Sequence, residues 1–365
     1  YSGISRANTA IVKIPEIKMN ESKKNRLIAE ARTLRALYYF NLVRFFGDVP
    51  LILDLKTVED SKGPRDSKEL IYDQIIEDLT FAEEHLPLRS EYSASDEGRI
   101  NKGAAKILFG KVYLTKGDFQ KAKDKLAEVV EHESEYGFGL HKDYHANWLR
   151  DTEAGIEAVL YIEYKEPPFQ HNGEMALAGP KYSIPGSLGI SALNEADIPT
   201  QELYDQFDNR DLRKKTNFKT EFAHLKTGEI LKSSIPLSGK FWVEGLETGD
   251  RCDVNMHIIR YADAILMYAE ALNEVGESTK ALAMLNRIRE RAFGDDSGNF
   301  KPMSKDEFRT AILNERRLEF PHEGHRWFDL VRTGTFIQRM KEHSAYEAKV
   351  AEANKTEIAQ NIKEH

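Results

Sequence analysis

Hydrophobic residues recur at helical spacing over two stretches in the first quarter of the chain. Between residues 23 and 46 they return every three or four positions, which predicts a helix that ends at the breaker sequence Gly47-Asp-Val-Pro50. A second helix is predicted over 67–86, entered at Ser67 and ended by Pro87. The first apolar stripe is Leu27, Ala31, Leu34, Tyr38, Leu42 and Phe45; the second is Leu70, Ile71, Ile75, Leu79, Ala82 and Leu86.

Two later segments read as copies of one helix-turn-helix unit. Small and large residues alternate there around a glycine, and each position in the first copy has a counterpart 159 residues later (269 − 110 = 159). This is the tetratricopeptide pattern, in which small residues allow helices to approach and glycine makes the turn. The matched pairs are Gly110/Ala269, Tyr113/Leu272, Gly117/Gly276, Ala122/Ala281, Leu126/Leu285 and Val129/Ile288. Residues 27–86 and 304–333 would be more divergent pairs, giving four in all.

The composition and the hydrophobic pattern change between about residues 134 and 255. This stretch is rich in Gly, Pro, Ser and aromatic residues, with a strand-like run at Ala158-Val-Leu-Tyr-Ile-Glu163. Turn signals occur at Pro167-Pro168, Gly179-Pro180 and Pro185-Gly186. A long irregular segment inside a compact protein is more often functional than idle. The organisation expected is therefore helical repeats over 1–133 and 256–334, an irregular ligand-binding subdomain over 134–255, and a polar tail over 335–365.

Composition narrows the class of protein. The chain has 365 residues, 41% hydrophobic and 31% charged, as in a globular protein with a sizeable core. A formal net charge of −8 and the lack of a basic run argue against nucleic-acid binding. A single cysteine excludes an internal disulfide and any multi-cysteine metal site. No apolar run approaches the roughly 20 residues that a membrane helix needs.

Charged and large apolar residues are interleaved over residues 312–334, ILNERRLEFPHEGHRWFDLVRTG. A solvated helix would keep its charges on one face, so some of these charges must be buried and paired. We expect a structural network of ion pairs that joins two helices across the Pro321–Gly324 turn, with Trp327 in the core. Its members are Glu315, Arg316, Glu319, Glu323, Arg326 and Asp329.

The same stretch resembles the C-terminal motif of the SusD/RagB family, the surface nutrient-binding lipoproteins of Bacteroidetes. Three further segments resemble that family in the expected order: EARTLRALYYFNLVRFFGDVPL at 30–51, GRINKGAAKILFGKVYLTKGDF at 98–119 and RYADAILMYAEALNE at 260–274. The resemblance implies a mainly α fold, a scaffold of four tetratricopeptide-like helix pairs with an inserted loop-rich subdomain. It also implies that further N- and C-terminal regions, including a lipid anchor, belong to the complete protein.

The function implied by the resemblance is non-catalytic capture of a nutrient, most often an oligosaccharide or polysaccharide. The expected partner is a SusC-like TonB-dependent transporter, and the expected place is the outer face of the outer membrane. No motif for a nucleophile, phosphate loop or metal site stands out, and we predict no catalytic residue and no cofactor. His322 and His325 lack the further ligands that zinc requires, while His141 and His145, four residues apart, would share one side of a helix and are a weak candidate for a metal site.

Aromatic side chains of the irregular region are the candidate ligand contacts. A sugar presents an apolar C–H face that packs on an indole or phenol ring, while nearby polar groups bind its hydroxyls. The candidates are Trp148, Trp242, Tyr144 and Tyr182, with Tyr164 and Phe169 as weaker ones. The same aromatic residues could instead fill the core of the subdomain.

Two other classes of protein remain open on the residues alone. A tetratricopeptide adaptor that binds a peptide would show a repeat array without a large insertion. A helical glycan-active enzyme would need two carboxylates at catalytic separation, and the distance between two carboxylates cannot be obtained from sequence alone.

Overall fold

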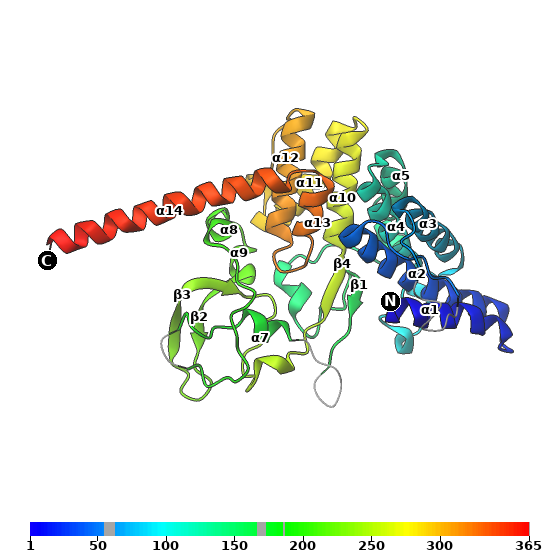
Figure 1. The fold of residues 1–365 in the computed structure, drawn as a ribbon, viewed down its shortest axis with the longest axis horizontal. Coiled ribbons are helices and arrows are strands. Elements are labelled where there is room, and N and C mark those ends of the chain that lie inside the picture. Colours follow the sequence, from blue (N-terminus) through cyan, green and yellow to red (C-terminus); the bar gives the residue numbers. More distant parts are fainter. Residues whose placement is uncertain (55–62, 166–172, 185–186, 365) are drawn as a thin grey trace. The chain divides into compact units, whose positions relative to one another are not determined.

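The computed structural model describes residues 1–54, 63–165, 173–184 and 187–364, with side chains described up to residue 353. Phe169 and the turns at Pro167-Pro168 and Pro185-Gly186 lie outside these residues. The chain divides into two compact units. Unit 1 comprises Tyr1–Glu163 and Val254–Ile312, and unit 2 comprises Tyr164–Asp253 and Leu313–His365. Helices predominate, as the sequence predicted (Figure 1).

Unit 1 is built mostly of helices. They are α1 (Ser2–Lys13), α2 (Glu21–Phe46), α3 (Lys68–His85), α4 (Lys102–Lys116), α5 (Phe119–Val130), α6 (Glu133–Tyr136), α10 (Tyr261–Glu274), α11 (Ser278–Phe293) and the first part of α12 (Lys305–Glu319). Side chains cap several of them: Asn20, Ser67, Asn101 and Asp118 accept backbone hydrogen bonds at the starts of α2, α3, α4 and α5. The sequence thus placed the ends of α2 and α3 to within two residues.

The buried face of α2 differs from the predicted stripe. Ala29, Ala36 and Phe40 are fully buried, whereas Phe45 is 58% exposed. The helix carries apolar residues on more than one face, because α3 packs on one side and α1 on another. Tyr38, for example, lies close against Gly3 of α1. For α3 the prediction is confirmed except at Leu70, which is exposed.

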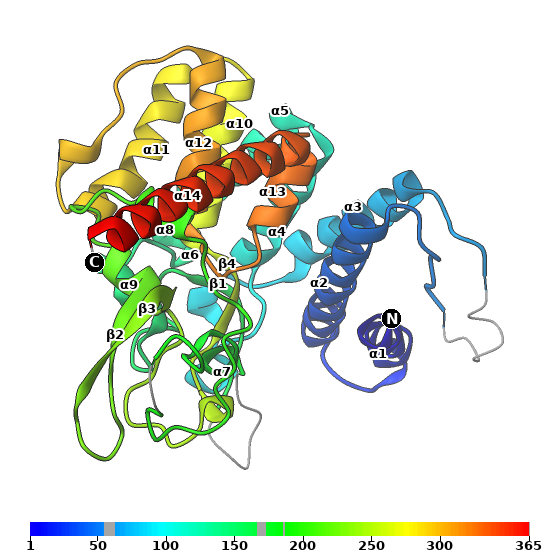
Figure 2. The same cartoon turned by 60° about the vertical axis from the view of Figure 1, so that its left-hand side comes forward.

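The two predicted helix pairs, α4–α5 and α10–α11, pack as hairpins, and α10 also packs on α5 (Figure 2). A Cβ atom placed on Gly110 of α4 would come within 2.5 Å of the Leu126 side chain of α5. Gly117 and Gly276, which end α4 and follow α10, have φ angles of +80° and +90°. Glycine therefore serves both purposes that the pattern assigns to it.

A two-stranded antiparallel sheet completes unit 1. It pairs β1 (Ala158–Ile162) with β4 (Met256–Arg260), and Ile162 lies opposite Met256. The strand-like run noted in the sequence is therefore a strand. The 90 residues between Glu163 and Val254 (254 − 163 − 1 = 90) belong to unit 2, and the chain leaves and re-enters unit 1 next to this sheet.

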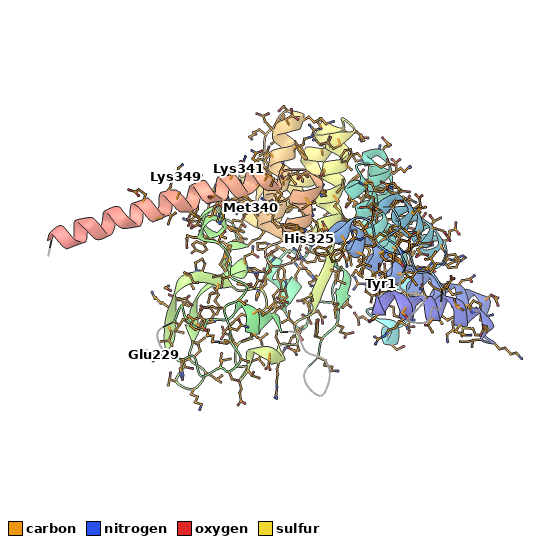
Figure 3. The ribbon with its side chains drawn as sticks, viewed as in Figure 1. Tyr1, Glu229, His325, Met340, Lys341 and Lys349 are labelled. Atoms are coloured by element: carbon orange, nitrogen blue, oxygen red, sulfur yellow. The ribbon has the colours of Figure 1, made fainter. Side chains whose placement is uncertain are left out.

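Unit 2 combines short helices, a β-hairpin and a long C-terminal helix. Its elements are α7 (Glu174–Ala178), α8 (Gln201–Asp205), α9 (Lys214–Asn217), β2 (Phe218–Ala223), β3 (Ile230–Ser238), the end of α12, α13 (Arg326–Arg332) and α14 (Phe336–Glu364). The residues expected to form a polar tail are helical, with Met340, Lys341 and Lys349 along α14 (Figure 3).

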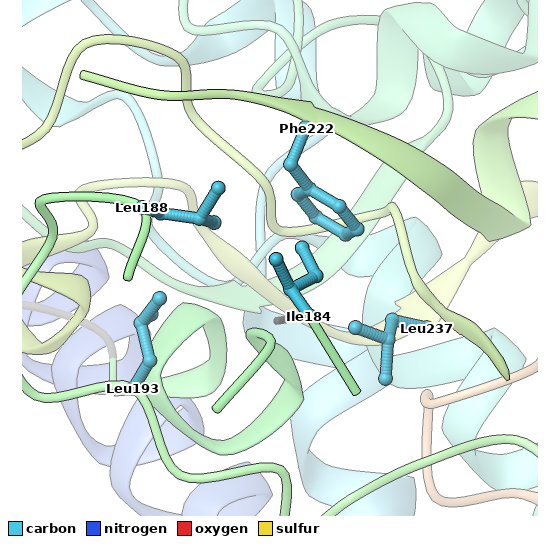
Figure 4. Packing of buried hydrophobic residues seen from close by; sticks show 5 residues of the cluster. All are labelled: Ile184, Leu188, Leu193, Phe222 and Leu237. Atoms are coloured by element: carbon cyan, nitrogen blue, oxygen red, sulfur yellow. The ribbon is translucent and has the colours of Figure 1, made fainter. Parts of the chain in front are cut away.

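A small hydrophobic core holds the β2–β3 hairpin to the preceding loops. Its buried members come from both strands and from residue 184 and the 188–193 segment, and they converge on the Phe222 ring (Figure 4). They are Ile184, Leu188, Leu193, Phe222 and Leu237, with Trp242 packed against them. Residues of the irregular region thus form a core of their own.

Candidate ligand-binding site

Tyr144 and Trp148 lie together in unit 1, on one short 3-10 helix. Their ring centroids are 4.8 Å apart in an edge-to-face arrangement, and only 3% and 4% of the two residues is exposed. The Arg260 guanidinium lies 5.2 Å from the Trp148 centroid. Arg260 in turn binds the fully buried Glu157, with 2.5 Å between nitrogen and oxygen. Both rings therefore pack in the interior of unit 1 and offer no exposed face to a sugar.

Trp242 is only partly buried in unit 2. It packs edge-to-face on Phe222, with centroids 4.7 Å apart, and the Lys219 ammonium lies 5.9 Å from its ring. Its indole Nε1 is shielded from solvent and finds no hydrogen-bond partner among the described residues. Because this nitrogen is shielded from solvent, a sugar could reach only the exposed part of the Trp242 ring.

Tyr182 is the most exposed of the candidates, at 75%. Its loop is nevertheless ordered by Glu195, whose Oε1 accepts hydrogen bonds from the backbone nitrogens of Lys181 and Ser183, both at 2.9 Å. Burial alone would raise the pKa of Glu195, but the hydrogen bonds from Ser183 and the backbone outweigh it and lower that pKa. Ser234 of β3 also donates to the Ser183 carbonyl, at 3.0 Å. No ring contact joins Tyr182 to Trp242 within the described part of the chain.

The charges of the 312–334 stretch are largely buried and paired in unit 2. Arg316 Nε lies 2.8 Å from Asp329 Oδ2, which links α12 to α13, and Arg332 lies 2.9 Å from the other oxygen of Asp329. Burial would raise the pKa of Asp329, but the two guanidinium groups lower it to about 2. Burial and the neighbouring cations Arg317 and Arg339 lower the pKa of Arg326 to about 10.

Two cations that sequence reasoning missed hold the remaining acids of this network. The Arg213 Nη1 atom lies 2.8 Å from Glu315 Oε1 and 2.9 Å from Glu319 Oε2, and Lys240 Nζ lies 2.5 Å from Glu323. Both cations are fully buried. They come from residues about a hundred positions away, and no local pattern links them to the acids. Trp327, expected in the core, is 47% exposed and packs on Phe336 instead.

Unit 2 also contains a hollow beside its first strand, which we call the β2 pocket. It has a volume of about 440 Å³ and is bounded by α8, α9 and β2. Its lining combines three lysines with aromatic, aliphatic and neutral polar groups: Tyr204, Asn209, Asp211, Leu212, Lys214, Lys215, Phe218, Lys219, Thr220 and Glu221. Over the described residues, no cluster of His, Cys, Asp and Glu is arranged to hold a metal ion, and no helix is long and apolar enough to cross a bilayer.

Comparison with known proteins identifies the family. A model described as the SusD family matches residues 237–365, and one described as "Starch-binding associating with outer membrane" matches residues 1–114. The chain is 31% identical over 369 residues to the SusD-like protein P2 of Formosa agariphila, an alignment covering 91% of this chain and 70% of that protein. The chain belongs to the SusD family.

Solved structures agree with this assignment. A SusD superfamily protein from Parabacteroides distasonis is 28% identical, with a TM-score of 0.78 over 91% of this chain and 73% of that one. A laminarin-binding SusD-like protein is 30% identical, with a TM-score of 0.77 over 94% of this chain and 78% of that one. The mainly helical SusD-like fold predicted from sequence is therefore confirmed.

Proposed function

We propose that this protein captures a glycan at the cell surface and does not cleave it. The observation that carries the proposal is the 30% identity to a laminarin-binding SusD-like protein over 94% of the chain. A surface glycan-binding protein A from Bacteroides uniformis, 25% identical over 92% of the chain, supports the same class of ligand. A neutral β-glucan such as laminarin is accordingly the first ligand to test.

The proposal extends to where the glycan goes. The bound glycan is delivered to a SusC-like TonB-dependent transporter, and the protein is held at the outer membrane by a lipid anchor in its N-terminal region. The family model that matches residues 1–114 is described as associating with the outer membrane, which supports this location. A pull-down of the full-length protein from the membrane fraction tests both the membrane location and the complex with a transporter. If the protein were recovered from that fraction without any transporter, the delivery step would be contradicted.

Tyr182 is proposed as a contact for the glycan. An exposed phenol ring is a platform on which the C–H face of a sugar can pack, and order in the supporting loop lowers the entropy cost of binding. The hydrogen bonds of Glu195 supply that order on both sides of Tyr182. The Lys181 ammonium lies 5.2 Å from the centroid of the ring and adds a donor for a hydroxyl.

Calorimetry with laminari-oligosaccharides tests the capture of glycan by this residue. We expect Tyr182→Ala to weaken binding by about tenfold, equivalent to about 1.4 kcal/mol, because the sugar loses its stacking surface. The free energy of unfolding should change by less than about 0.5 kcal/mol, since the ring is exposed. Phe46→Ala is the matched control, because it removes an equally accessible ring, 61% exposed, from α2.

Two results would contradict the proposal. Equal affinities for the Tyr182 variant and the parent would remove this residue from the site. Shorter oligosaccharides recovered after incubation would show cleavage and favour a glycan-active enzyme over a binding protein.

A further inference from the structure

We propose that the β2 pocket binds an anionic substituent, a carboxylate or a sulfate, so that the protein binds acidic saccharides more tightly than neutral ones. This inference rests on the proposed function, because it names the class of glycan that the same unit would hold.

The β2 pocket is made by one continuous piece of chain. Its lining residues all fall between Tyr204 and Glu221, where the chain passes from α8 through α9 into β2. The rings below it are fixed by packing: Phe218 lies edge-to-face to both Tyr204 and Phe207, at 5.2 and 5.1 Å between centroids. Its volume of about 440 Å³ falls among small-molecule sites, roughly 300–1,000 Å³.

The acids of the pocket already have partners. Asp211 is 4% exposed and binds Arg213 through both oxygens, with nitrogen–oxygen distances of 3.0 and 2.7 Å. Glu221 lies 3.3 Å from Lys232 of β3. The charge of Asp211 is therefore matched by Arg213, whereas the exposed pair of Glu221 and Lys232 offsets the charge of Glu221 only in part.

Two lysines of the pocket keep an uncompensated charge. The Lys214 ammonium donates to neutral oxygens only, the Phe207 carbonyl at 3.3 Å and Asn209 Oδ1 at 3.1 Å, and lies 4.4 Å from the Tyr204 centroid. Lys215 is exposed, and no carboxylate lies within ion-pair distance of either ammonium in the described part of the chain. Lys219, by contrast, pairs with Glu244 at 2.8 Å.

An anion in the β2 pocket would supply the missing countercharge. Hydrogen bonds between an ammonium and an oxyanion are about twice as strong as neutral ones, and partial enclosure reduces screening by salt. The other lining groups match the rest of a sugar: Leu212, 47% exposed, offers an apolar surface, while Asn209 and Thr220 offer hydrogen-bonding groups. The net charge of −8 over the whole chain makes the pocket a local exception and disfavours a nucleic acid as the anion.

The experiment compares an oligoglucuronate with the same oligosaccharide after reduction of its carboxylates to alcohols, and with a sulfated oligosaccharide of equal length. Binding to the intact protein is measured by calorimetry for the parent, for the double variant Lys214→Gln/Lys215→Gln and for Lys226→Gln. Lys226 is exposed in the β2–β3 turn and lies outside the pocket, so its variant controls for the loss of a charge. Thermal melting checks that each variant is folded.

We expect the parent to bind the charged oligosaccharide about tenfold more tightly than its reduced form. The double variant should lose that preference, while Lys226→Gln keeps it. Preference for the uronate or for the sulfated form would say which anion the pocket takes. Equal binding of charged and reduced forms, or an unchanged preference in the double variant, would overturn the inference and leave glycan capture intact. Failure of every glycan, charged or neutral, to bind would overturn the proposed function itself.

Discussion

The absence of one side chain sets the distance between α4 and α5. Gly110 lies where a Cβ atom would meet Leu126 Cγ at 2.5 Å, well inside van der Waals contact. Leu126 is fully buried, so it cannot swing aside. The counterpart of Gly110 in the α10–α11 pair is Ala269, so the second pair accommodates one more methyl group than the first.

Gly110→Ala should therefore destabilise the protein. Alanine favours a helix by about 1 kcal/mol over glycine, but overpacking a buried contact costs about 1–3 kcal/mol, so we expect a net loss of stability of about 1 kcal/mol. Urea denaturation followed by circular dichroism measures this change in the free energy of unfolding. Gly173→Ala is the control, because nothing lies within 4 Å of the added Cβ. A Gly110 variant as stable as the parent would show that α5 can shift away from α4.

Aromatic candidates could be found from sequence, but their exposure could not. Trp148 and Tyr182 both stand in a Gly- and Pro-rich stretch with polar neighbours, yet one is 4% and the other 75% exposed. The difference depends on Arg260, which is 112 residues from Trp148 (260 − 148 = 112) and covers its ring. No pattern within a short window contains that contact.

At the scale of elements, one carboxylate fastens three helices of unit 2. Glu202 of α8 binds Arg317 of α12 at 3.1 Å, Arg339 of α14 at 3.0 Å and His343 of α14 at 2.7 Å. Burial would raise the pKa of Glu202, but the hydrogen bonds from His343 and Arg317 prevail and lower that pKa to about 2. The first turns of α14 are thus attached through a group that must be ionised.

The attachment of α14 should fail in acid. The ordinary pKa of a glutamate is 4.5 and the folded value is about 2, so between these pH values the unfolded chain binds more protons. The stability that Glu202 contributes is complete above pH 4.5 and is lost as the pH falls to about 2. Glu202→Gln should cost about 2 kcal/mol at neutral pH and progressively less below pH 4.5. Hydrogen exchange of residues 337–346, recorded as the pH falls, measures the attachment of α14 in the parent and in the variant. If both lost protection equally in acid, the role of Glu202 would be contradicted.

Helix positions were predictable because caps and breakers lie next to the helix they bound. Gly47 ends α2 and Ser67 caps α3, and the sequence placed both signals correctly. The buried face of α2 was harder, because Arg35 lies in the interior, where it binds Asp78 of α3 at 2.7 Å and Asn8 of α1 at 2.9 Å. A prediction based on apolar residues alone leaves out a buried arginine. It therefore assigns the wrong side of the helix to the core.

At the scale of the whole molecule, unit 1 is assembled from two stretches of chain that are separated in sequence by residues 164–253. The sequence placed the irregular region at 134–255, whereas unit 1 keeps residues up to Glu163 and resumes at Val254. Residues 134–163 stay with it because β1 pairs with β4 and because Glu157 binds Arg260 and Arg291, at 2.5 and 3.2 Å. These contacts join residues about a hundred positions apart, which composition cannot reveal.

This connectivity predicts that unit 1 can fold without the 164–253 segment. Because Ile162 lies opposite Met256, Glu163 faces Asn255, and the dipeptide Asn-Gly placed between these two residues would connect β1 to β4 as a two-residue hairpin in the same register. A chain of 1–163, Asn-Gly and 255–312 keeps Arg260 and Arg291, the buried partners of Glu157, and all of α10, most of which is fully buried. It should melt cooperatively with a helical dichroism spectrum. Residues 1–163 alone should not, because β1 then lacks its partner strand and α5 lacks α10. If the joined chain failed to fold while the intact protein folded, the stability of unit 1 would depend on residues 164–253, and the prediction would be wrong.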